Sequence, residues 1–470
     1  MPSSLSLPRL LLSAPHKSSG KTTVTIGLCA ALRARGLTVQ PYKKGPDYID
    51  PMWHGQAAQR PCQNLDFNVQ SDDEIRHQLV LNSEGVDISL IEGNMGMFDS
   101  LDLGGRHSNA ELAELLETPV ILIIDVQGAT RSIVPLIQGF IHFDSGHNIA
   151  GIILNNVAGK RHEARLREVI GHYIDRPVVG AIHRNSALVI DERHLGLIPS
   201  NESSEVEKKV SEIAQIVGSQ VDLDLLLNIA SNAPAITRTE ISVKPSPLYS
   251  TLRIGVAQDA AFGFYYPDDL QQFVELGAEL LPFSPLKDRA IPEELDGLFI
   301  GGGFPETHLS QLGNNREMQQ SIAQAIESGM PCYAECGGLM YLSQNIEWQG
   351  TTEPMVGIIP AGCTVHKKPI GRGLAQLATT EYHPWPFTTV GVSFPAHEFH
   401  YSELGSLPSQ SHFAYRIIRG SGIGDQADGF IYKNLLANYT HLRSVNATPW
   451  VNHFLEFVAQ KRDSRLQSAG

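Results

Sequence analysis

The chain contains 470 residues and has a mass of 51.4 kDa, which is too large for one ordinary domain and predicts two or three globular units. Hydrophobic residues make up 42% and charged residues 18%, so each unit can bury a core and wholesale disorder is excluded. The net charge of −14, from 36 basic and 50 acidic residues, argues against binding to nucleic acid or to anionic membranes.

The cysteine content and the length of the apolar runs indicate the cellular location of the protein. Five cysteines are spread over the chain without a disulfide framework or a metal-ligand spacing, which favours reduced cytoplasmic thiols. The longest apolar runs, such as residues 120–126, are much shorter than the roughly 20 residues of a membrane-spanning helix. We therefore expect a soluble cytoplasmic protein.

The first half of the chain alternates short apolar runs with helical patterns. Strands are expected at 10–13, 38–42, 88–92, 120–125 and 149–154, and helices at 22–35, 109–116 and 161–172. Such alternation predicts a mainly parallel sheet with helices on both faces.

A stretch rich in Pro, Ser and Thr at 231–250 predicts a linker to a second α/β series. Its elements are expected as strands at 252–256, 278–283, 297–300 and 331–334, an antiparallel pattern at 354–406 and a last helix at 450–462. We expect two α/β domains, 1–230 and 251–462, each a mainly parallel sheet flanked by helices, and then a tail at 463–470.

The loop between the first strand and the first helix has the composition of a phosphate-binding loop. It contains Lys17, Ser18, Ser19, Gly20, Lys21, Thr22 and Thr23. Backbone N–H groups at a helix N-terminus cradle phosphate oxygens, and we expect Lys21 to reach the β and γ phosphates while Thr22 ligates Mg²⁺. Pro15 replaces the first glycine of the usual motif, and the alternative is an ordinary glycine turn with a solvated lysine.

Charged residues follow the strand ends at which ligands collect in a parallel sheet. We expect Asp47 and Glu92 to meet Thr22 around one Mg²⁺, with Asp125 as a further candidate; helix capping is the alternative for any one of them. Lys43 and Lys44 suggest an anionic second substrate, although a solvated pair is the alternative. Alternate strand residues point to opposite faces, so we expect one lysine to contact phosphate or substrate and the other to be solvated.

Cys336 lies at a strand-to-helix turn that reads PCYAECGGLMY. We expect the helix N-terminus to lower the pKa of this thiol and to make it a nucleophile, with Gly337 permitting a close backbone approach. Gly302 and Gly303 follow another strand and could donate N–H groups to an oxyanion. Candidate bases are His397, His400 and His441, and the alternative for Cys336 is a buried inert cysteine.

With both motifs in view, the sequence resembles the cobyrinic acid a,c-diamide synthase family over nearly its whole length. The matching segments are SGKTTVTIGL, GPDYIDP, IEGNMGMFD, AGIILNNV, GGGFPE, AECGGLMYL and HEFHYSEL. The resemblance implies an N-terminal ATP-dependent amidoligase domain with a phosphate loop, similar to dethiobiotin synthetase, and a C-terminal class I glutamine amidotransferase domain.

The resemblance also implies roles for residues. Lys21, Thr22, Asp47 and Glu92 would serve ATP and Mg²⁺, Asn155 would help to hold adenine, and Cys336 would form a glutamyl thioester with His441 as its base. His397 and His400 would be structural or line the interface, while Lys43, Lys44, Tyr48 and Asp99 are the residues expected to contact the substrate. Two departures stand out: members commonly have an apolar residue where this chain has Lys44, and the glutamate found two positions beyond the catalytic histidine in other class I enzymes is missing, which leaves the orienting residue unidentified.

The implied function is ATP-dependent amidation of acetate carboxylates on a tetrapyrrole, through an acyl phosphate and glutamine-derived ammonia, by a protein that could form a homodimer. Cobyrinate, hydrogenobyrinate, siroheme (as in relatives from sulfur-oxidising bacteria) and nickel sirohydrochlorin are the candidate rings. The rival functions are a ligase like dethiobiotin synthetase and an ATP-binding regulatory protein, each with a non-functional glutaminase domain.

Overall fold

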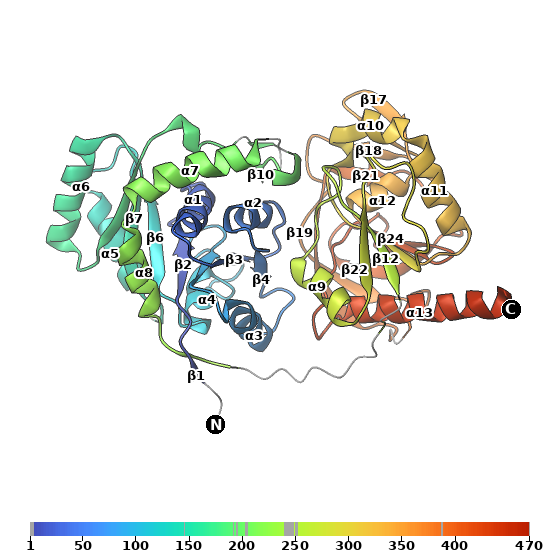
Figure 1. Ribbon diagram of the computed structural model, residues 1–470, viewed down its shortest axis with the longest axis horizontal. Helices are drawn as coiled ribbons and strands as arrows, with labels where there is room; N and C mark the ends of the chain where they lie inside the picture. Colours follow the sequence, from blue (N-terminus) through green and yellow to red (C-terminus); the bar gives the residue numbers. More distant parts are fainter. Residues whose placement is uncertain are drawn as a thin grey trace. The chain divides into compact units, whose positions relative to one another are not determined.

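The structure is a computed structural model that describes residues 4–144, 146–190, 192–193, 196–202, 205–238, 249, 252–386 and 389–469. The chain divides into two compact units, Met1–Ser242 and Val243–Gly470, each built around its own large sheet (Figure 1).

The first unit contains a seven-stranded parallel sheet in the order β4-β3-β5-β2-β6-β7-β8. Its strands are β2 (Arg9–Ser13), β3 (Val39–Lys44), β4 (Gln63–Leu65), β5 (Ile88–Glu92), β6 (Val120–Asp125), β7 (Ile149–Val157) and β8 (Val178–His183). The predicted parallel sheet is therefore confirmed. Strand β3 runs beyond the predicted 38–42 because Lys43 pairs with Glu92 and Lys44 with Leu65.

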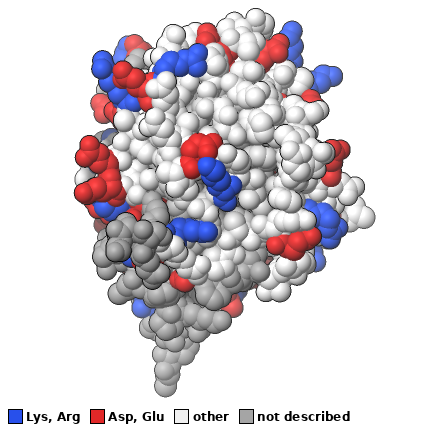
Figure 2. All heavy atoms as spheres, turned by 90° about the vertical axis from the view of Figure 1, so that its right-hand side faces the viewer, with Lys and Arg blue, Asp and Glu red and all other residues white. Residues whose placement is uncertain are grey.

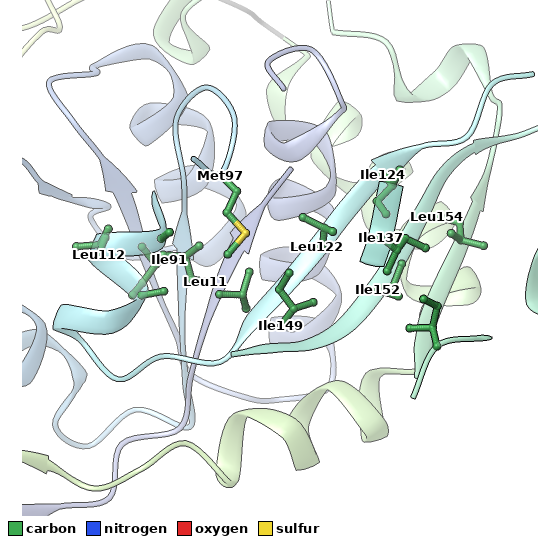
Figure 3. Close-up of a cluster of buried hydrophobic side chains, with 14 of the residues drawn as sticks. Leu11, Ile91, Met97, Leu112, Leu122, Ile124, Ile137, Ile149, Ile152 and Leu154 are labelled. Atoms are coloured by element: carbon green, nitrogen blue, oxygen red, sulfur yellow. The ribbon is translucent and has the colours of Figure 1, made fainter. Parts of the chain in front are cut away.

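Helices cover this sheet, and branched apolar side chains fill the space beneath them. The helices are α1 (Lys21–Ala34), α2 (Ile49–Ala58), α3 (Asp72–Ser83), α4 (Asn109–Leu115), α5 (Ile133–His142), α6 (Lys160–Tyr173), α7 (Val206–Gln220) and α8 (Leu223–Ser231). Helix α1 packs against α2 and α7 (Figure 1). Figure 3 shows part of the core, where Leu122, Ile124 and Ile152 on β6 and β7 meet Ile137 on α5.

The predicted linker at 231–250 is structured where it begins. Ser231 ends α8, and β11 (Ile236–Thr237) forms an antiparallel pair with β1 (Ser4–Leu5) near the start of the chain. Burial of Ile236 explains why this segment folds back onto the first unit. Residues 239–248 and 250 of the predicted linker lie outside the described residues.

The second unit contains a nine-stranded sheet in the order β13-β12-β14-β15-β24-β23-β22-β19-β20. The first five strands are parallel: β13 (Glu279–Phe283), β12 (Arg253–Ala257), β14 (Gly297–Ile300), β15 (Cys332–Glu335) and β24 (Leu435–Asn438). The others are antiparallel: β23 (Ala427–Tyr432), β22 (His412–Arg419), β19 (Gly371–Thr379) and β20 (Ser393–His400). The pairing of β19 with β20 confirms the predicted antiparallel pattern.

The described part of the second unit also contains a smaller sheet and five α-helices. The sheet has the order β17-β16-β18-β21, with β16 (Asn345–Trp348), β17 (Thr351–Pro354), β18 (Cys363–Val365) and β21 (Ser402–Leu404). The helices are α9 (Pro267–Glu275), α10 (Leu309–Asn314), α11 (Arg316–Glu327), α12 (Gly337–Leu342) and α13 (Trp450–Ala469).

Helix α13 corrects the predicted tail at 463–470, because it continues to Ala469. No glycine or proline interrupts the chain after Arg462 until Gly470, so nothing stops the helix earlier. Within the described ranges, no helix is long and apolar enough to cross a membrane. On the face of the molecule drawn in Figure 2, acidic and basic side chains are interspersed.

Candidate active site

The loop between β2 and α1 has a backbone that requires glycine at one position. Gly20 has φ +89°, and a Cβ atom there would lie 2.2 Å from Asn155 Nδ2. The Asn155 amide donates to the carbonyl of Ser19 at 2.9 Å. Asn155, expected to hold adenine, therefore supports the phosphate loop from β7.

Lys21 begins α1 and reaches across this loop. Its Nζ donates to the carbonyl of Met95 at 2.5 Å and to that of His16 at 3.3 Å. Burial lowers the pKa of Lys21, and the nearby Glu92 opposes this effect. The ammonium thus lies at the carboxyl edge of the sheet, where a nucleotide phosphate would compensate its charge.

Glu92, at the end of β5, is the centre of a buried charged cluster. Its Oε1 accepts hydrogen bonds from Thr22 Oγ1 at 2.8 Å and Lys43 Nζ at 2.8 Å, and its Oε2 contacts His54 Nε2. Burial alone raises the pKa of Glu92, but Lys43 and His54 outweigh it and hold the pKa well below its usual range. Glu92 is therefore ionised and firmly oriented toward Thr22.

Asp50, which is not among the residues predicted from the sequence, contacts Thr22, where Asp47 was expected. Asp50 Oδ2 lies 3.3 Å from Thr22 Oγ1 and 2.5 Å from Lys43 Nζ. Asp47 Oδ1 instead accepts the backbone N–H groups of Ile49 and Asp50 at the start of α2, at 2.9 and 3.1 Å. Burial, followed by the charge of Asp50, raises the pKa of Asp47 to about 6.

The donor set around Thr22 fits Mg²⁺. Mg²⁺ commonly binds through one or two carboxylates and a hydroxyl, with water and phosphate oxygens completing the octahedron. Thr22, Asp50 and Glu92 provide such a set. Within the part of the chain that the structure describes, no group of three or more His, Cys, Asp or Glu side chains could hold a metal ion. A Mg²⁺ bound here would take water and nucleotide phosphate oxygens as its other ligands.

The two adjacent lysines of β3 are both buried, so the expectation that one is solvated is wrong. Lys43 belongs to the Glu92 cluster, whereas Lys44 Nζ donates to Asn94 Oδ1 at 3.1 Å and to the carbonyl of His107 at 2.6 Å. The cause is the continuation of β3 through both residues, which carries the two side chains to opposite faces.

The other residues predicted from the sequence lie near this edge of the sheet or make hydrogen bonds to nearby residues. Tyr48 precedes α2, and Asp99 Oδ2 accepts the backbone N–H of Gly96 at 2.7 Å. Asp125 accepts hydrogen bonds from Asn156 Nδ2 at 2.9 Å and from the backbone N–H of Gln127 at 2.8 Å.

In the second unit, Cys336 occupies a strained turn between β15 and α12. Its φ of +47° and ψ of −102° are unusual for a residue with a Cβ atom. A Cβ atom on Gly337 would lie 2.9 Å from Gly303 N, and one on Gly338 would lie 2.1 Å from the carbonyl oxygen of Ile300. The two glycines therefore allow the start of α12 to pack directly on the 301–303 loop, which brings the expected oxyanion donors beside Cys336.

The structure corrects the expected pKa of the Cys336 thiol. Burial raises this pKa above its usual value, the charges of Glu306 and Glu335 raise it further, and the backbone N–H of Gly337 only partly opposes them. The helix N-terminus does not outweigh desolvation. The resting group is a thiol, and its proton must pass to a base when it attacks.

His441 follows β24, the parallel neighbour of β15, so its loop and the Cys336 turn leave the same sheet edge. Its Nδ1 lies 3.4 Å from Glu335 Oε2, and both side chains are buried. Glu335 Oε1 accepts hydrogen bonds from Tyr333 OH at 2.5 Å and from the backbone N–H of Leu442 at 3.0 Å. Glu335 is therefore the candidate for the residue that orients His441, which could not be identified from the sequence.

The two other candidate bases, His397 and His400, pack against neighbouring rings and lie close to backbone groups. His397 stacks on His441, with ring centroids 4.9 Å apart, and the two residues exchange backbone hydrogen bonds. Burial holds the pKa of His397 well below its usual value. His400 stacks on Tyr439 at 4.0 Å, and its Nδ1 lies 2.8 Å from the carbonyl of Ser402.

Known families match both units. Residues 15–197 match the CobQ/CobB/MinD/ParA nucleotide binding domain, and residues 253–448 match the CobB/CobQ-like glutamine amidotransferase domain. A protein of Magnetococcus marinus named cobyrinate a,c-diamide synthase is 44% identical over 97% of this chain and 98% of its own. A protein of the same name from Methanosarcina acetivorans is 38% identical over 98% and 97%. The solved structure of PurLQS from Thermotoga maritima covers 46% of this chain and 99% of its own, at 14% identity and a TM-score of 0.35.

Proposed function

This chain belongs to the cobyrinate a,c-diamide synthase family, and we propose that it converts the a and c acetate carboxylates of cobyrinate into primary amides with ATP and glutamine. The observation that carries this proposal is the identity of 44% over 97% of the chain with a protein of that name. The relatives carry the cobyrinate name, so siroheme and nickel sirohydrochlorin have no support among them.

The residues of the first unit are suited to activate a carboxylate. A substrate carboxylate oxygen attacks the γ-phosphorus of ATP, and the bond between the γ-phosphorus and the oxygen that bridges it to the β-phosphate breaks. ADP is the leaving group, and the product is an acyl phosphate. We assign Lys21 to the phosphate charge and Thr22, Asp50 and Glu92 to Mg²⁺, which neutralises charge on the phosphates when bound. Ammonia then attacks the acyl carbon, and inorganic phosphate leaves.

The residues of the second unit are suited to release that ammonia. Nδ1 of His441 faces Glu335, which leaves Nε2 to accept the Cys336 proton as sulfur attacks the amide carbon of glutamine. Backbone N–H groups of Gly302, Gly303 and Gly337 are assigned to the developing oxyanion. Ammonia departs with the proton from His441, and water hydrolyses the thioester to glutamate.

Mass spectrometry of the products tests the function directly. The protein is incubated with ATP, Mg²⁺, glutamine and, separately, cobyrinate, hydrogenobyrinate, siroheme and nickel sirohydrochlorin. Each amide replaces OH by NH₂, so the mass shift counts the amides, and we expect two on cobyrinate. Amidation of siroheme alone, or of no tetrapyrrole, contradicts the proposal. We also propose a homodimer, which light scattering on the purified protein tests.

A further inference from the structure

Lys44 is a buried cation whose hydrogen-bond partners carry no charge. Its Nζ donates to Asn94 Oδ1 at 3.1 Å and to the carbonyl of His107 at 2.6 Å. Lys43, its neighbour, instead contacts the carboxylates of Asp50 and Glu92. Within the described ranges, no carboxylate lies within ion-pair distance of Lys44, although only 5% of this residue is exposed.

A lysine in such surroundings is poorly compensated. Desolvation lowers the pKa of Lys44 to about 8, while the more distant Asp66 and Glu111 raise it and Lys43 lowers it further. An ammonium has three donors, and two of them are used by neutral oxygens. A buried charge is costly unless it is paired, so an anion that reached Lys44 would gain a strong charge-assisted hydrogen bond.

The cover over Lys44 comes from one segment at the surface. It ends β3 at the same sheet edge as the Glu92 cluster, but on the opposite face of the strand from Lys43. The groups that cover its ammonium are surface residues, since Asn94 is half-buried and His107 is exposed. Both belong to the segment between β5 and α4, which also supplies the Met95 carbonyl that contacts Lys21.

We propose that Lys44 forms a carboxylate subsite that binds a side chain of the tetrapyrrole other than the one being phosphorylated. This inference rests on the proposed function, because it takes the polycarboxylate as substrate. The Lys43 cluster serves the nucleotide and the reacting group, whereas Lys44 holds a second carboxylate on the other side of β3. Two separate anchors fix both the position and the rotation of a large ring.

The test compares two neutral variants with a matched control. Lys44→Met removes charge and donor, Lys44→Gln keeps an N–H donor without the charge, and Lys160→Met removes the same charge from an exposed position of the same unit. Equilibrium binding of cobyrinate is measured without ATP, and the KM values for cobyrinate and ATP are measured with glutamine.

Both Lys44 variants should weaken cobyrinate binding and raise its KM by about ten- to a hundredfold, the range expected for a lost hydrogen bond to a charged group. The KM for ATP should stay within about twofold, and Lys160→Met should behave as the wild type. Unchanged cobyrinate affinity in Lys44→Met refutes the subsite. An equal loss of ATP affinity, or near-normal binding by Lys44→Gln, also refutes it, because Lys44 would then only fix the 93–108 segment. If the wild type amidates no tetrapyrrole, the proposed function itself has failed.

Discussion

Substitution of Glu335 by Gln tests the assignment of the orienting carboxylate. Glu335 Oε2 lies 3.4 Å from His441 Nδ1, and the two residues are only 3% exposed each. When Cys336 gives up its proton, His441 becomes an imidazolium beside this carboxylate. At an effective dielectric constant of about 20, two unit charges at this separation attract by about 5 kcal/mol.

This attraction sets the expected loss of activity. About 5 kcal/mol corresponds to a factor of roughly 10³–10⁴ in rate, and the hydrogen bonds from Tyr333 and Leu442 spread the negative charge and reduce that factor. We therefore expect Glu335→Gln to lower the kcat of glutamine hydrolysis by about 10³-fold. Amidation supported by high ammonium should remain near the wild-type rate, because the first unit is unchanged.

The assay measures glutamate release and, separately, amide formation with glutamine or with ammonium. Tyr333→Phe is the matched control, since it removes one neutral donor to Glu335 at 2.5 Å and keeps the carboxylate. The kcat of glutamine hydrolysis by Tyr333→Phe should fall by less than about tenfold. A Glu335→Gln enzyme that hydrolyses glutamine within tenfold of the wild type would show that another group orients His441.

Three further substitutions separate the two half-reactions. Cys336→Ala should abolish glutamine-supported amidation and leave ammonium-supported amidation, and product formation with glutamine would exclude Cys336 as the nucleophile. Lys21→Ala should abolish amidation with either nitrogen source, because the acyl phosphate cannot form; normal ATP consumption would show that the loop does not bind ATP. Asp50→Asn should raise the Mg²⁺ concentration needed for half-maximal ATP binding, measured by calorimetry, by tenfold or more, whereas Asp125→Asn should leave it unchanged. Equal Mg²⁺ requirements would remove Asp50 from the metal site.

The parallel sheets were predictable because their strands are continuous apolar runs. Residues 88–92 and 120–124 are buried on both faces, and the predicted bounds 88–92 and 120–125 match β5 and β6. Helix α2 was harder to predict from the sequence, because Pro51 and Gly55 disfavour a helix and its first residues have the composition of an acidic loop. Tertiary packing overrides that local preference, as Trp53 and His54 are buried.

Two residues of the candidate site, Asp50 and Glu335, were not predicted because their positions depend on tertiary structure. Asp50 lies on α2, so its meeting with Thr22 depends on a helix that the sequence pattern did not predict. Glu335 directly precedes Cys336, and side chains of adjacent strand residues ordinarily point to opposite faces. The positive φ of Cys336 changes the chain direction, and His441 arrives from β24, which is nearly a hundred residues later in the chain. No local pattern contains that pairing.

The net charge of −14 describes the whole chain and does not determine the charge of the ligands that a buried site binds. At physiological salt the screening length is about 8 Å, so distant surface carboxylates contribute little at a buried site. Lys21, Lys43 and Lys44 all lie at the carboxyl edge of the sheet, and each is at most 7% exposed. Lys43 is neutralised by Asp50 and Glu92, whereas the described partners of Lys21 and Lys44 are all neutral oxygens. An acidic protein thus holds two poorly compensated cations at the carboxyl edge of one sheet, Lys21 at the start of α1 and Lys44 at the end of β3. A phosphate at Lys21 and a carboxylate at Lys44, as proposed above, would supply the charge that this edge lacks.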